Sequence, residues 1–333
     1  MKHNNIAIFV PHLGCPNMCS FCNQHSISGE ETLPSAERVK QICEQAMREV
    51  SNRSNTEIAF FGGSFTAIER GYMLELLGAA NEFVGKDGFK GIRISTRPDY
   101  IDEEVLALLR SFGVTAIELG AQSMVDKVLF ANNRGHSAED IMNASRLINE
   151  NGFELGLQMM VGLYKSTIEY EYETMREIAR LSPETVRIYP VAVLGGTRLG
   201  ELYQKGDYTL YSFDEVVGIC AEMLTFFEEN GIRIIRMGLH ASEIIESEMM
   251  GGFYHPAFKE IVESRIYRNN ITEATNSHPS RDNYNIYVNS NCISKALGHK
   301  KSNVIYFNEK GISIKIKSDS KLKKYECKLE DGY

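Results

Sequence analysis

The sequence predicts an α/β fold in which strands and helices alternate around a parallel sheet. Short runs rich in apolar and β-branched residues alternate with longer segments whose apolar residues recur with a helical period. Glycines follow several of the helical segments, where a residue that tolerates the left-handed region is favoured. Six or seven such strand–helix units predict a complete or partial barrel. In such barrels, functional residues gather at the carboxyl ends of the strands.

Seven strands and six helices follow from these patterns. The predicted strands are Asn5–Val10, Glu57–Phe61, Gly91–Thr96, Thr115–Leu119, Glu154–Met160, Thr185–Tyr189 and Arg233–Arg236. The predicted helices are Ala36–Asn52, Tyr72–Val84, Glu103–Phe112, Ala138–Asn151, Ile168–Leu181 and Phe213–Asn230. Ser35 and Asp102 directly precede two of these helices, where their side-chain oxygens can accept hydrogen bonds from the first turn.

The composition indicates a large core and no disulfide framework. A chain of 333 residues that is 43% hydrophobic suffices for one barrel-sized domain or about two smaller ones. The seven cysteines include a tight cluster, which favours a metal site in a reducing compartment over disulfides. The sequence has neither an apolar signal segment nor an apolar run of membrane-spanning length. We therefore expect a cytoplasmic protein without a membrane segment.

Charge is distributed unevenly along the chain. Residues 284–333 carry ten lysines, no arginine and five acidic residues, a net charge of +5, whereas the whole chain carries −8. The rest of the chain therefore carries −13. A basic end on an acidic body fits a polyanionic partner. A solvated lysine-rich surface would give the same pattern, so both interpretations stay open.

Three cysteines crowd into one short segment directly after the first predicted strand. Cys15, Cys19 and Cys22 suit a [4Fe–4S] cubane that is held through three of its four irons. The fourth iron would then keep an open coordination position for a small molecule. Cys43 and Cys220 lie among apolar residues of predicted helices, so we expect them to be small buried hydrophobes.

Glycine and polar residues lie at the ends of the other predicted strands. They are Gly62 and Gly63 after the second strand, Ser95 in the third, Gln122 after the fourth, and Val161 and Gly162 after the fifth. Glycines let a ligand approach the main chain closely, and the polar side chains hydrogen-bond hydroxyl and carboxylate groups. We therefore expect one rim of the barrel to bind one polar cofactor.

These residues resemble the radical S-adenosylmethionine (SAM) enzymes. The C-x3-C-x2-C motif of that family, with an aromatic residue before the last cysteine, is matched by Cys15, Cys19, Phe21 and Cys22. The likeness extends to the radical-SAM domain of the Elongator catalytic subunit and covers roughly residues 5–265. It is carried further by the segments 62–65, 118–123, 133–136, 159–163, 187–190 and 196–197.

The resemblance implies specific roles for the motif residues. Cys15, Cys19 and Cys22 would bind three irons of a [4Fe–4S] cluster, and SAM would chelate the fourth. The other implied SAM contacts are Gly62 and Gly63 to its amino group, Ser95, Gln122 and Arg134 to its ribose and carboxylate, and Val161, Gly162 and Phe21 around its adenine. No residue of the chain is singled out as a catalytic acid or base.

The resemblance also implies the fold and the cofactor chemistry. Residues 1–265 are expected to form a partial TIM barrel of the (β/α)6 type. The family uses an electron from a donor such as flavodoxin or ferredoxin to cleave SAM to a 5′-deoxyadenosyl radical, which abstracts hydrogen from a substrate. The protein then supplies orientation and excludes water.

Residues 266–333 are predicted to form a small basic module. The Elongator subunit continues into an acetyltransferase domain, and this segment is too short for one. It looks like part of a KH module, in which two helices flank a G-x-x-G loop that clamps the nucleotide backbone. The loop reads Gly298, His299, Lys300 and Lys301, so the second glycine is missing while cations for phosphates remain. A degenerate RNA-binding module and a similar α/β cap both fit.

Three functions stay open at this point. The leading one is a radical SAM enzyme that modifies RNA, such as tRNA, with the basic module holding the substrate. The second resembles the oxygen-independent coproporphyrinogen oxidases and places a small molecule in the barrel. The third is a non-catalytic iron–sulfur protein that binds nucleic acid. The intact cysteine and glycine motifs argue against the third.

Overall fold

The computed structural model describes residues 4–10, 15, 18–23, 32–239, 243–278 and 282–330. The chain divides into two units. The first consists of Met1–Tyr211 and Phe227–Tyr254, and the second of Ser212–Phe226 and His255–Tyr333. The boundary after residue 265 that we predict from the sequence falls inside helix α11 (Phe258–Asn276).

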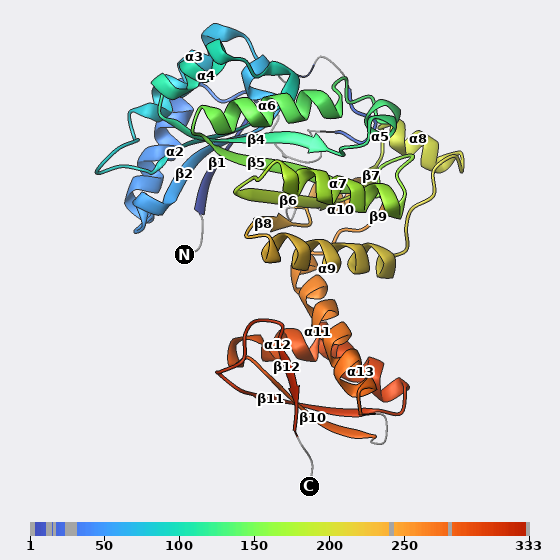
Figure 1. The fold of residues 1–333 in the computed structure, drawn as a ribbon. Coiled ribbons are helices and arrows are strands. Elements are labelled where there is room, and N and C mark those ends of the chain that lie inside the picture. The colour runs from blue at the N-terminus through green and yellow to red at the C-terminus, as the bar shows by residue number, and fades with distance from the viewer. Residues whose placement is uncertain are drawn as a thin grey trace. The chain divides into compact units, whose positions relative to one another are not determined.

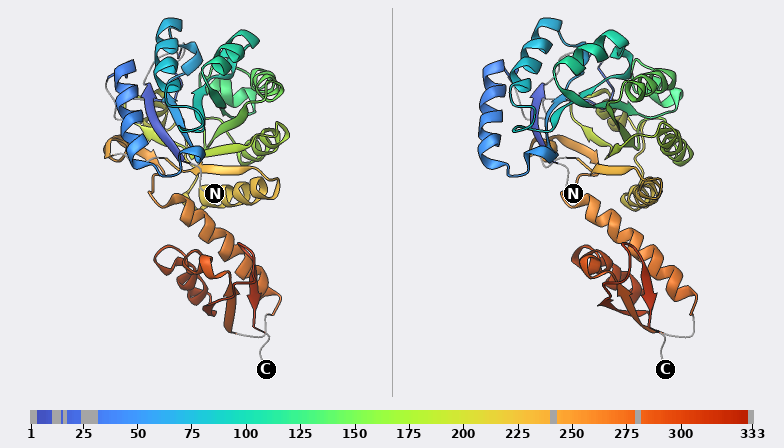
Figure 2. Two further views of the ribbon diagram at one scale, coloured as in Figure 1. Left: turned by 90° about the vertical axis from the view of Figure 1, so that its left-hand side faces the viewer. Right: turned by 60° about the vertical axis from the view of Figure 1, so that its left-hand side comes forward.

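The first unit is built on a seven-stranded sheet with the order β1-β2-β3-β4-β5-β6-β8. The strands are β1 (Asn4–Val10), β2 (Thr56–Gly62), β3 (Gly91–Thr96), β4 (Val114–Gln122), β5 (Glu154–Val161), β6 (Thr185–Pro190) and β8 (Arg233–Met237). All neighbouring pairs are parallel, and the sheet curls into part of a barrel (Figure 2). The predicted partial barrel is thus confirmed, with each predicted strand found within three residues of its expected ends.

Helices cover the outer side of this sheet (Figures 1 and 2). They are α2 (Ala36–Glu49), α3 (Arg70–Asn81), α4 (Glu103–Ser111), α6 (Ala138–Glu150) and α7 (Ile168–Arg180). A further helix, α9 (Phe213–Glu229), contributes residues to both units. The predicted helices are confirmed within three residues. The predicted caps are also present, because Ser35 accepts from the Arg38 N–H at 3.2 Å and Asp102 from the Val105 N–H at 2.8 Å.

Several short elements were not predicted from the sequence. They are α5 (Asp126–Ala131), β7 (Ala192–Leu194), α8 (Arg198–Gln204), α10 (Glu243–Glu248) and β9 (Met249–Gly252). Elements this short show no clear period, and short helices depend on tertiary packing for their stability. Val128 of α5 and Leu199 of α8 are fully buried in one apolar cluster with Leu163, and Phe21 packs against the same cluster.

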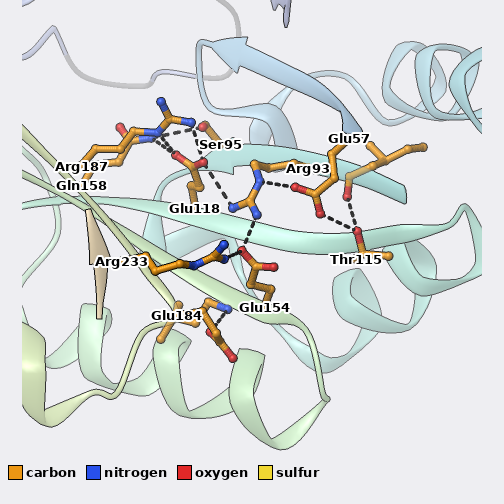
Figure 3. A network of polar contacts seen from close by, with 12 residues as sticks. Glu57, Arg93, Ser95, Thr115, Glu118, Glu154, Gln158, Glu184, Arg187 and Arg233 are labelled. Carbon is orange, nitrogen blue, oxygen red and sulfur yellow. Dashed lines mark hydrogen bonds and ion pairs between the residues drawn. The ribbon is translucent and has the colours of Figure 1, made fainter. Parts of the chain in front are cut away.

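The two sides of the strands differ in chemistry because successive side chains point to opposite faces. On the outer side, residues such as Ile58, Phe60 and Ile92 are completely buried under the helices. The inner side carries charged residues at the alternate positions, including Glu57 on β2 and Arg93 on β3. The barrel interior is therefore filled by a polar network, which Figure 3 shows from close by.

Arg93 and Glu118 are the centres of this network. Arg93 is completely buried and contacts Glu57 at 2.7 Å, Glu118 at 3.3 Å and Glu154 at 2.5 Å. Glu118 also accepts two hydrogen bonds from Arg187, at 2.6 and 2.9 Å. Burial raises the pKa of Glu118, but the two arginines outweigh burial and hold that pKa below its ordinary value. Arg93 and Glu118 therefore both stay charged, because each lies beside side chains of opposite charge.

The second unit is a small α/β structure. Its elements are α11, β10 (Asn283–Val288), α12 (Ile293–Leu297), α13 (Ser302–Glu309), β11 (Ser313–Ser318) and β12 (Cys327–Leu329). The sheet has the order β11-β10-β12, with β10 parallel to β11 and antiparallel to β12. Tyr267, Ile286 and Phe307 are among the buried residues of its own apolar core.

Candidate active site

The sequence motifs lie at the carboxyl ends of the parallel strands. The described cysteines follow β1, Gly62 ends β2, Gln122 ends β4 and Val161 ends β5. Because all strands of the sheet run in the same direction, these ends form one edge of the partial barrel. This edge is called the rim below.

Three free thiols occupy the rim after β1. Cys15 is exposed, whereas Cys19 and Cys22 are half-buried, and the Cys22 N–H donates to the Cys19 carbonyl at 3.1 Å. Burial raises the pKa of Cys15, and burial with the nearby Cys19 raises that of Cys22 to about 12. Among the described residues, no three His, Cys, Asp or Glu side chains are spaced to hold a single ion. Ligands of a cubane bind separate irons, so this spacing does not exclude a cluster.

Arg134 connects the cysteine segment to the end of β4. Its Nη1 donates to Cys19 Sγ at 3.0 Å, and its Nη2 donates to the Gly120 carbonyl at 2.5 Å. Its guanidinium also lies 6.0 Å from the centre of the Phe21 ring. A Cβ atom at Gly120 would lie 3.1 Å from Gln122 Nε2 and 3.3 Å from Arg134 Nη2. The glycine therefore leaves room for both side chains beside Cys19.

The two glycines after β2 bring the main chains of β1 and β2 close together. The Gly63 N–H donates to the Val10 carbonyl at 2.8 Å. A Cβ atom at Gly62 would lie 2.9 Å from the same oxygen, and its φ of +113° lies in a region that side chains disfavour. Only glycine fits this position without strain.

Ser95 lies among the interior residues. Its hydroxyl accepts a hydrogen bond from Gln158 Nε2 at 3.2 Å, and the same nitrogen donates to Glu118 at 2.9 Å (Figure 3). Ser95 is therefore bonded to the barrel network, whereas Gln122 and Arg134 lie close to Cys19. Ser95 is half-buried.

The end of β5 is held by a buried acid. The Gly162 N–H donates to Glu171 at 2.8 Å, and the Tyr208 hydroxyl donates to the Gly162 carbonyl. Glu171 is only 2% exposed, and burial raises its pKa to about 7. Val161 is buried, and a cavity of about 170 Å³ is lined by residues 162–166, 207–209 and 211. Phe21 packs against the apolar cluster that contains Leu163 and Tyr208.

Arg97, which follows β3, was not assigned a role from the sequence. This arginine is 4% exposed and forms two hydrogen bonds with Asp99, at 2.9 and 2.8 Å. It is close enough to Cys15 and Cys19 for their charges to interact. An arginine next to a predicted strand end was visible in the sequence, but its distance from the cysteines was not.

Several buried polar atoms at the rim have no hydrogen-bond partner among the described residues. They include Arg97 Nη1, Gln122 Oε1 and Arg134 Nε. Buried polar atoms are nearly always paired, since an unpaired one costs about 1–3 kcal/mol. Two cationic donors and one amide acceptor beside three thiols fit a polar, partly anionic ligand bound next to a metal cluster.

Comparison with known families agrees with this geometry. Residues 9–178 match the radical SAM superfamily, which is just over half of the chain, and residues 183–268 match the C-terminal domain of radical SAM proteins. This chain belongs to the radical SAM superfamily. That superfamily generally implies a [4Fe–4S] cluster and SAM as cofactors, and its members are enzymes.

The relatives support the predicted resemblance to the Elongator subunit. This radical SAM protein is 31% identical to the tRNA uridine(34) acetyltransferase of Methanocaldococcus infernus over 183 residues, 49% of this chain and 34% of the relative. It is 33% identical to Elongator complex protein 3 of Homo sapiens over 137 residues, 40% of this chain and 25% of the relative. The matches span about a third or less of these curated relatives.

Solved structures show the same fold. The archaeal Methanocaldococcus infernus Elp3 with an N-terminal deletion superposes with a TM-score of 0.58 and 23% identity, over 74% of this chain and 62% of that one. Coproporphyrinogen III oxidase of Escherichia coli gives 0.51 and 21%, over 69% and 54%. At these identities the likeness establishes the partial barrel and nothing finer.

The loop predicted to contact RNA belongs to the second unit and joins α12 to α13. Gly298 has a φ of +83°, and a Cβ atom there would lie 2.4 Å from Ser302 Oγ. Lys300 and Lys301 both adopt left-handed φ values, of 52° and 63°, and are exposed. The His299 ring lies 5.1 Å from that of His255, edge to face. The position of the missing glycine thus has a backbone conformation that glycine favours.

No helix in the described part of the chain is both long enough and apolar enough to cross a membrane.

Proposed function

We propose that this radical SAM protein modifies an RNA in the reducing cytoplasm, and that a tRNA is the first substrate class to test. The single observation that carries the proposal is the rim, where three thiols lie beside buried donors and an acceptor that lack protein partners. The names of the relatives, which include a tRNA uridine(34) acetyltransferase, support RNA as the substrate.

In this proposal Cys15, Cys19 and Cys22 bind three irons of a [4Fe–4S] cluster. When bound and reduced by a donor such as flavodoxin or ferredoxin, the cluster supplies the electron that cleaves SAM and so provides a 5′-deoxyadenosyl radical. Arg134 already donates to Cys19 Sγ, so it helps to hold that thiolate and to balance its charge.

The other rim residues orient SAM. Gln122 Oε1 and the free guanidinium nitrogens of Arg97 and Arg134 supply the acceptor and donors that hydroxyl and carboxylate groups need. Gly62 and Gly63 let the SAM amino group approach the main chain. Val161, Gly162 and Phe21 line the adenine, and Ser95, which bonds Gln158 of the interior network, is a further contact to SAM.

The network of charged side chains in the barrel interior closes the barrel below the rim. Arg93 and Arg187 are buried and both pair with Glu118, so side chains fill the barrel interior. A filled interior limits the entry of water to the reacting atoms, which protects a reactive intermediate from side reactions.

The second unit is proposed to hold the RNA. Lys300 and Lys301 are exposed in the loop between α12 and α13 and form no ion pair with a described residue. Cations on such a loop suit phosphates, which dominate the affinity of nucleic acids for proteins. Gly298 and His299 complete the predicted contact.

The test is an anaerobic turnover assay. Full-length protein is reconstituted with iron and sulfide, reduced with dithionite and given SAM, and 5′-deoxyadenosine is measured with tRNA, with a porphyrinogen and without either. We expect 5′-deoxyadenosine formation that tRNA increases and porphyrinogen does not. Stimulation by porphyrinogen alone would select the coproporphyrinogen-oxidase-like function, and no 5′-deoxyadenosine at all would refute the enzyme.

A matched pair of variants makes the assay specific. Cys22→Ser removes a proposed iron ligand, whereas Cys43→Ser removes a thiol that is completely buried on α2, away from the strand ends. We expect Cys22→Ser to abolish iron binding and product formation. Cys43→Ser is expected to retain iron in the folded fraction, so equal loss in both variants would contradict the assignment.

A further inference from the structure

Three consecutive residues after α5 contact three consecutive residues of the cysteine segment. Asn132 bonds Ser20, Asn133 bonds Met18, and Arg134 bonds Cys19. The two tripeptides are more than a hundred residues apart in the sequence. We refer to residues 132–134 as the anchor.

Asn132 and Ser20 are joined by two hydrogen bonds. The Ser20 N–H donates to the Asn132 carbonyl at 3.0 Å, and the Ser20 hydroxyl donates to Asn132 Oδ1 at 2.7 Å. The Ser20 carbonyl accepts from the Leu199 N–H at 2.7 Å. All polar groups of Ser20, which lies between Cys19 and Phe21, are therefore bonded to other parts of the first unit.

Asn132 is itself held rigidly. It is completely buried, and its Nδ2 donates to the carbonyls of Val128 at 2.8 Å and Tyr164 at 2.9 Å. The side chain therefore uses its acceptor for Ser20 and its donors for two fixed main-chain oxygens. Only an amide in this orientation satisfies all three partners, since a carboxylate would face two carbonyls without a proton to share.

The other two anchor residues hold the two positions that precede Ser20, Met18 and Cys19. Asn133 Nδ2 donates to the Met18 carbonyl at 2.8 Å, although the Met18 side chain is 79% exposed. Asn133 adopts a left-handed φ of 53°, which directs its side chain and that of Arg134 toward the same segment. The exposed Met18 is thus held through its main chain.

We propose that the anchor is a positioning device that holds the Cys19 part of the segment in its iron-binding conformation before a cluster is present, with Asn132 as its central residue. A preorganised segment loses less conformational freedom when its ligand binds, which favours binding. Residues that hold metal ligands typically change metal affinity or activity by about 10–100-fold when mutated. The inference rests on the cluster site of the proposed function but not on SAM cleavage or RNA.

The first experiment measures cluster retention without SAM or RNA. Protein reconstituted anaerobically is mixed with an iron chelator, and the loss of cluster absorbance is followed. We expect Asn132→Asp to lose its cluster roughly 10–100-fold faster than the natural chain. If the proposed function is wrong, the turnover assay will give no 5′-deoxyadenosine. If the anchor proposal is wrong, Asn132→Asp will lose its cluster at the natural rate.

Asn303→Asp is the matched control. Asn303 is 1% exposed in the second unit, and its Nδ2 also donates to two carbonyls, those of Ser264 at 2.8 Å and Ala296 at 3.0 Å. The two variants thus remove the same kind of buried bonds. We expect Asn303→Asp to keep the natural rate of cluster loss, and equal acceleration in both variants would overturn the anchor as a local device.

Two milder variants guard against misfolding of Asn132→Asp. Ser20→Ala removes only the hydroxyl bond, and Asn133→Gly keeps the left-handed φ while removing the bond to Met18. Each is expected to accelerate cluster loss by a smaller factor. Ser20→Ala and Asn132→Ala both remove the bond between the Ser20 hydroxyl and Asn132 Oδ1. The double variant should therefore accelerate cluster loss by less than the product of the two single effects. Natural rates in both milder variants would overturn the proposal.

The second experiment examines the cluster-free chain. Hydrogen exchange of a peptide that covers residues 18–22 is measured in full-length protein without iron. We expect the Ser20 amide to exchange more slowly than in an unstructured peptide, because its N–H bond to Asn132 exists before the cluster binds. Unprotected exchange in the folded, cluster-free chain would show that the cluster orders the segment and would refute preorganisation.

Discussion

The barrel interior and its rim both bury arginine and amide side chains, but they differ in how these groups are paired. In the interior, Arg93 contacts three carboxylates and Gln158 bonds two neighbours. At the rim, Arg97, Gln122 and Arg134 each keep one buried atom without a partner in the described part of the chain. The difference indicates that the interior is built for stability, whereas the rim is built for a ligand.

Two buried glutamates show the same contrast in their ionisation. Glu118 lies between Arg93 and Arg187, and its pKa is held below the ordinary value against the effect of burial. Glu171 accepts main-chain and hydroxyl hydrogen bonds but has no cation beside it among the described residues, and burial raises its pKa to about 7. The two carboxyls are similarly buried, but their pKa values shift in opposite directions because only Glu118 lies beside described arginines.

The largest expected effect concerns the interior. Glu118→Ala leaves Arg93 and Arg187 buried without their shared carboxylate, which should lower the free energy of unfolding by about 3–5 kcal/mol. Urea unfolding of the cluster-free protein measures it. The control is Glu104→Ala, since Glu104 is 87% exposed in its pair with Arg70 and should cost about 0–1 kcal/mol. Equal losses would show that the buried ion pairs of the interior contribute no more to stability than an exposed pair does.

The second prediction concerns the pH dependence caused by Glu171. Its folded-state pKa of about 7 lies above the ordinary 4.5, so its contribution to stability is fully present below about pH 4.5 and is lost as pH rises through about 7. Glu171→Gln cannot ionise. Its stability relative to the natural chain should therefore increase between about pH 5 and about pH 8, by up to about 3 kcal/mol.

Unfolding of both proteins at the two pH values provides the measurement. The Gly162 N–H can still donate to the amide oxygen of the variant, so the local structure is retained. A stability difference that stays constant with pH would show that the carboxyl ionises as it does in water.

The third prediction applies the contrast between paired and unpaired side chains to the lysines of the second unit. Lys295 and Lys324 both pair with Glu263, at 2.7 and 3.5 Å, whereas Lys300 and Lys301 do not pair with a described carboxylate. Charge reversal of both Lys300 and Lys301 should weaken RNA binding and reduce the slope of log affinity against log salt by about 2. Affinity measured over a range of salt concentrations tests this.

Charge reversal of Lys321 and Lys323 is the control for net charge, because both are exposed in the same unit. This control should weaken RNA binding less than the loop variant does. If both double variants behave alike, the RNA recognises overall charge and the loop between α12 and α13 is not its contact.

The smallest expected effect is at the rim. Gln122→Met removes an amide whose Oε1 has no partner among the described residues, so the free energy of unfolding should change by less than about 0.5 kcal/mol. SAM binding to the reconstituted protein should weaken roughly 2- to 10-fold, as expected for one hydrogen bond. Calorimetry or equilibrium dialysis measures it. Unchanged SAM binding would remove Gln122 from the proposed site.

Local patterns in the sequence were sufficient for the seven strands of the large sheet, for six of the helices and for the grouping of motifs at one rim, but they did not predict α11 (Phe258–Asn276). Alternation of apolar runs and helical periods reflects burial, which acts on each segment separately. Gly62 and Gly63 were expected to let a ligand approach the main chain, and the structure adds that Gly62 has a positive φ and lies close to the Val10 carbonyl. The short helices α5 and α8 were missed because packing on Leu163 and its neighbours, rather than a period of their own, stabilises them.

The sequence by itself determined that this chain is a partial barrel of the radical SAM type with three clustered cysteines, because those features depend on residues near one another in the chain. Only the tertiary structure decided which buried groups are paired. Asn132 bonds Ser20 and Glu118 bonds Arg187 across 112 and 69 residues, and Arg97 approaches the cysteines from another strand. Such pairings depend on distances in the folded chain, and they separate the groups that stabilise the barrel from those free to bind a ligand.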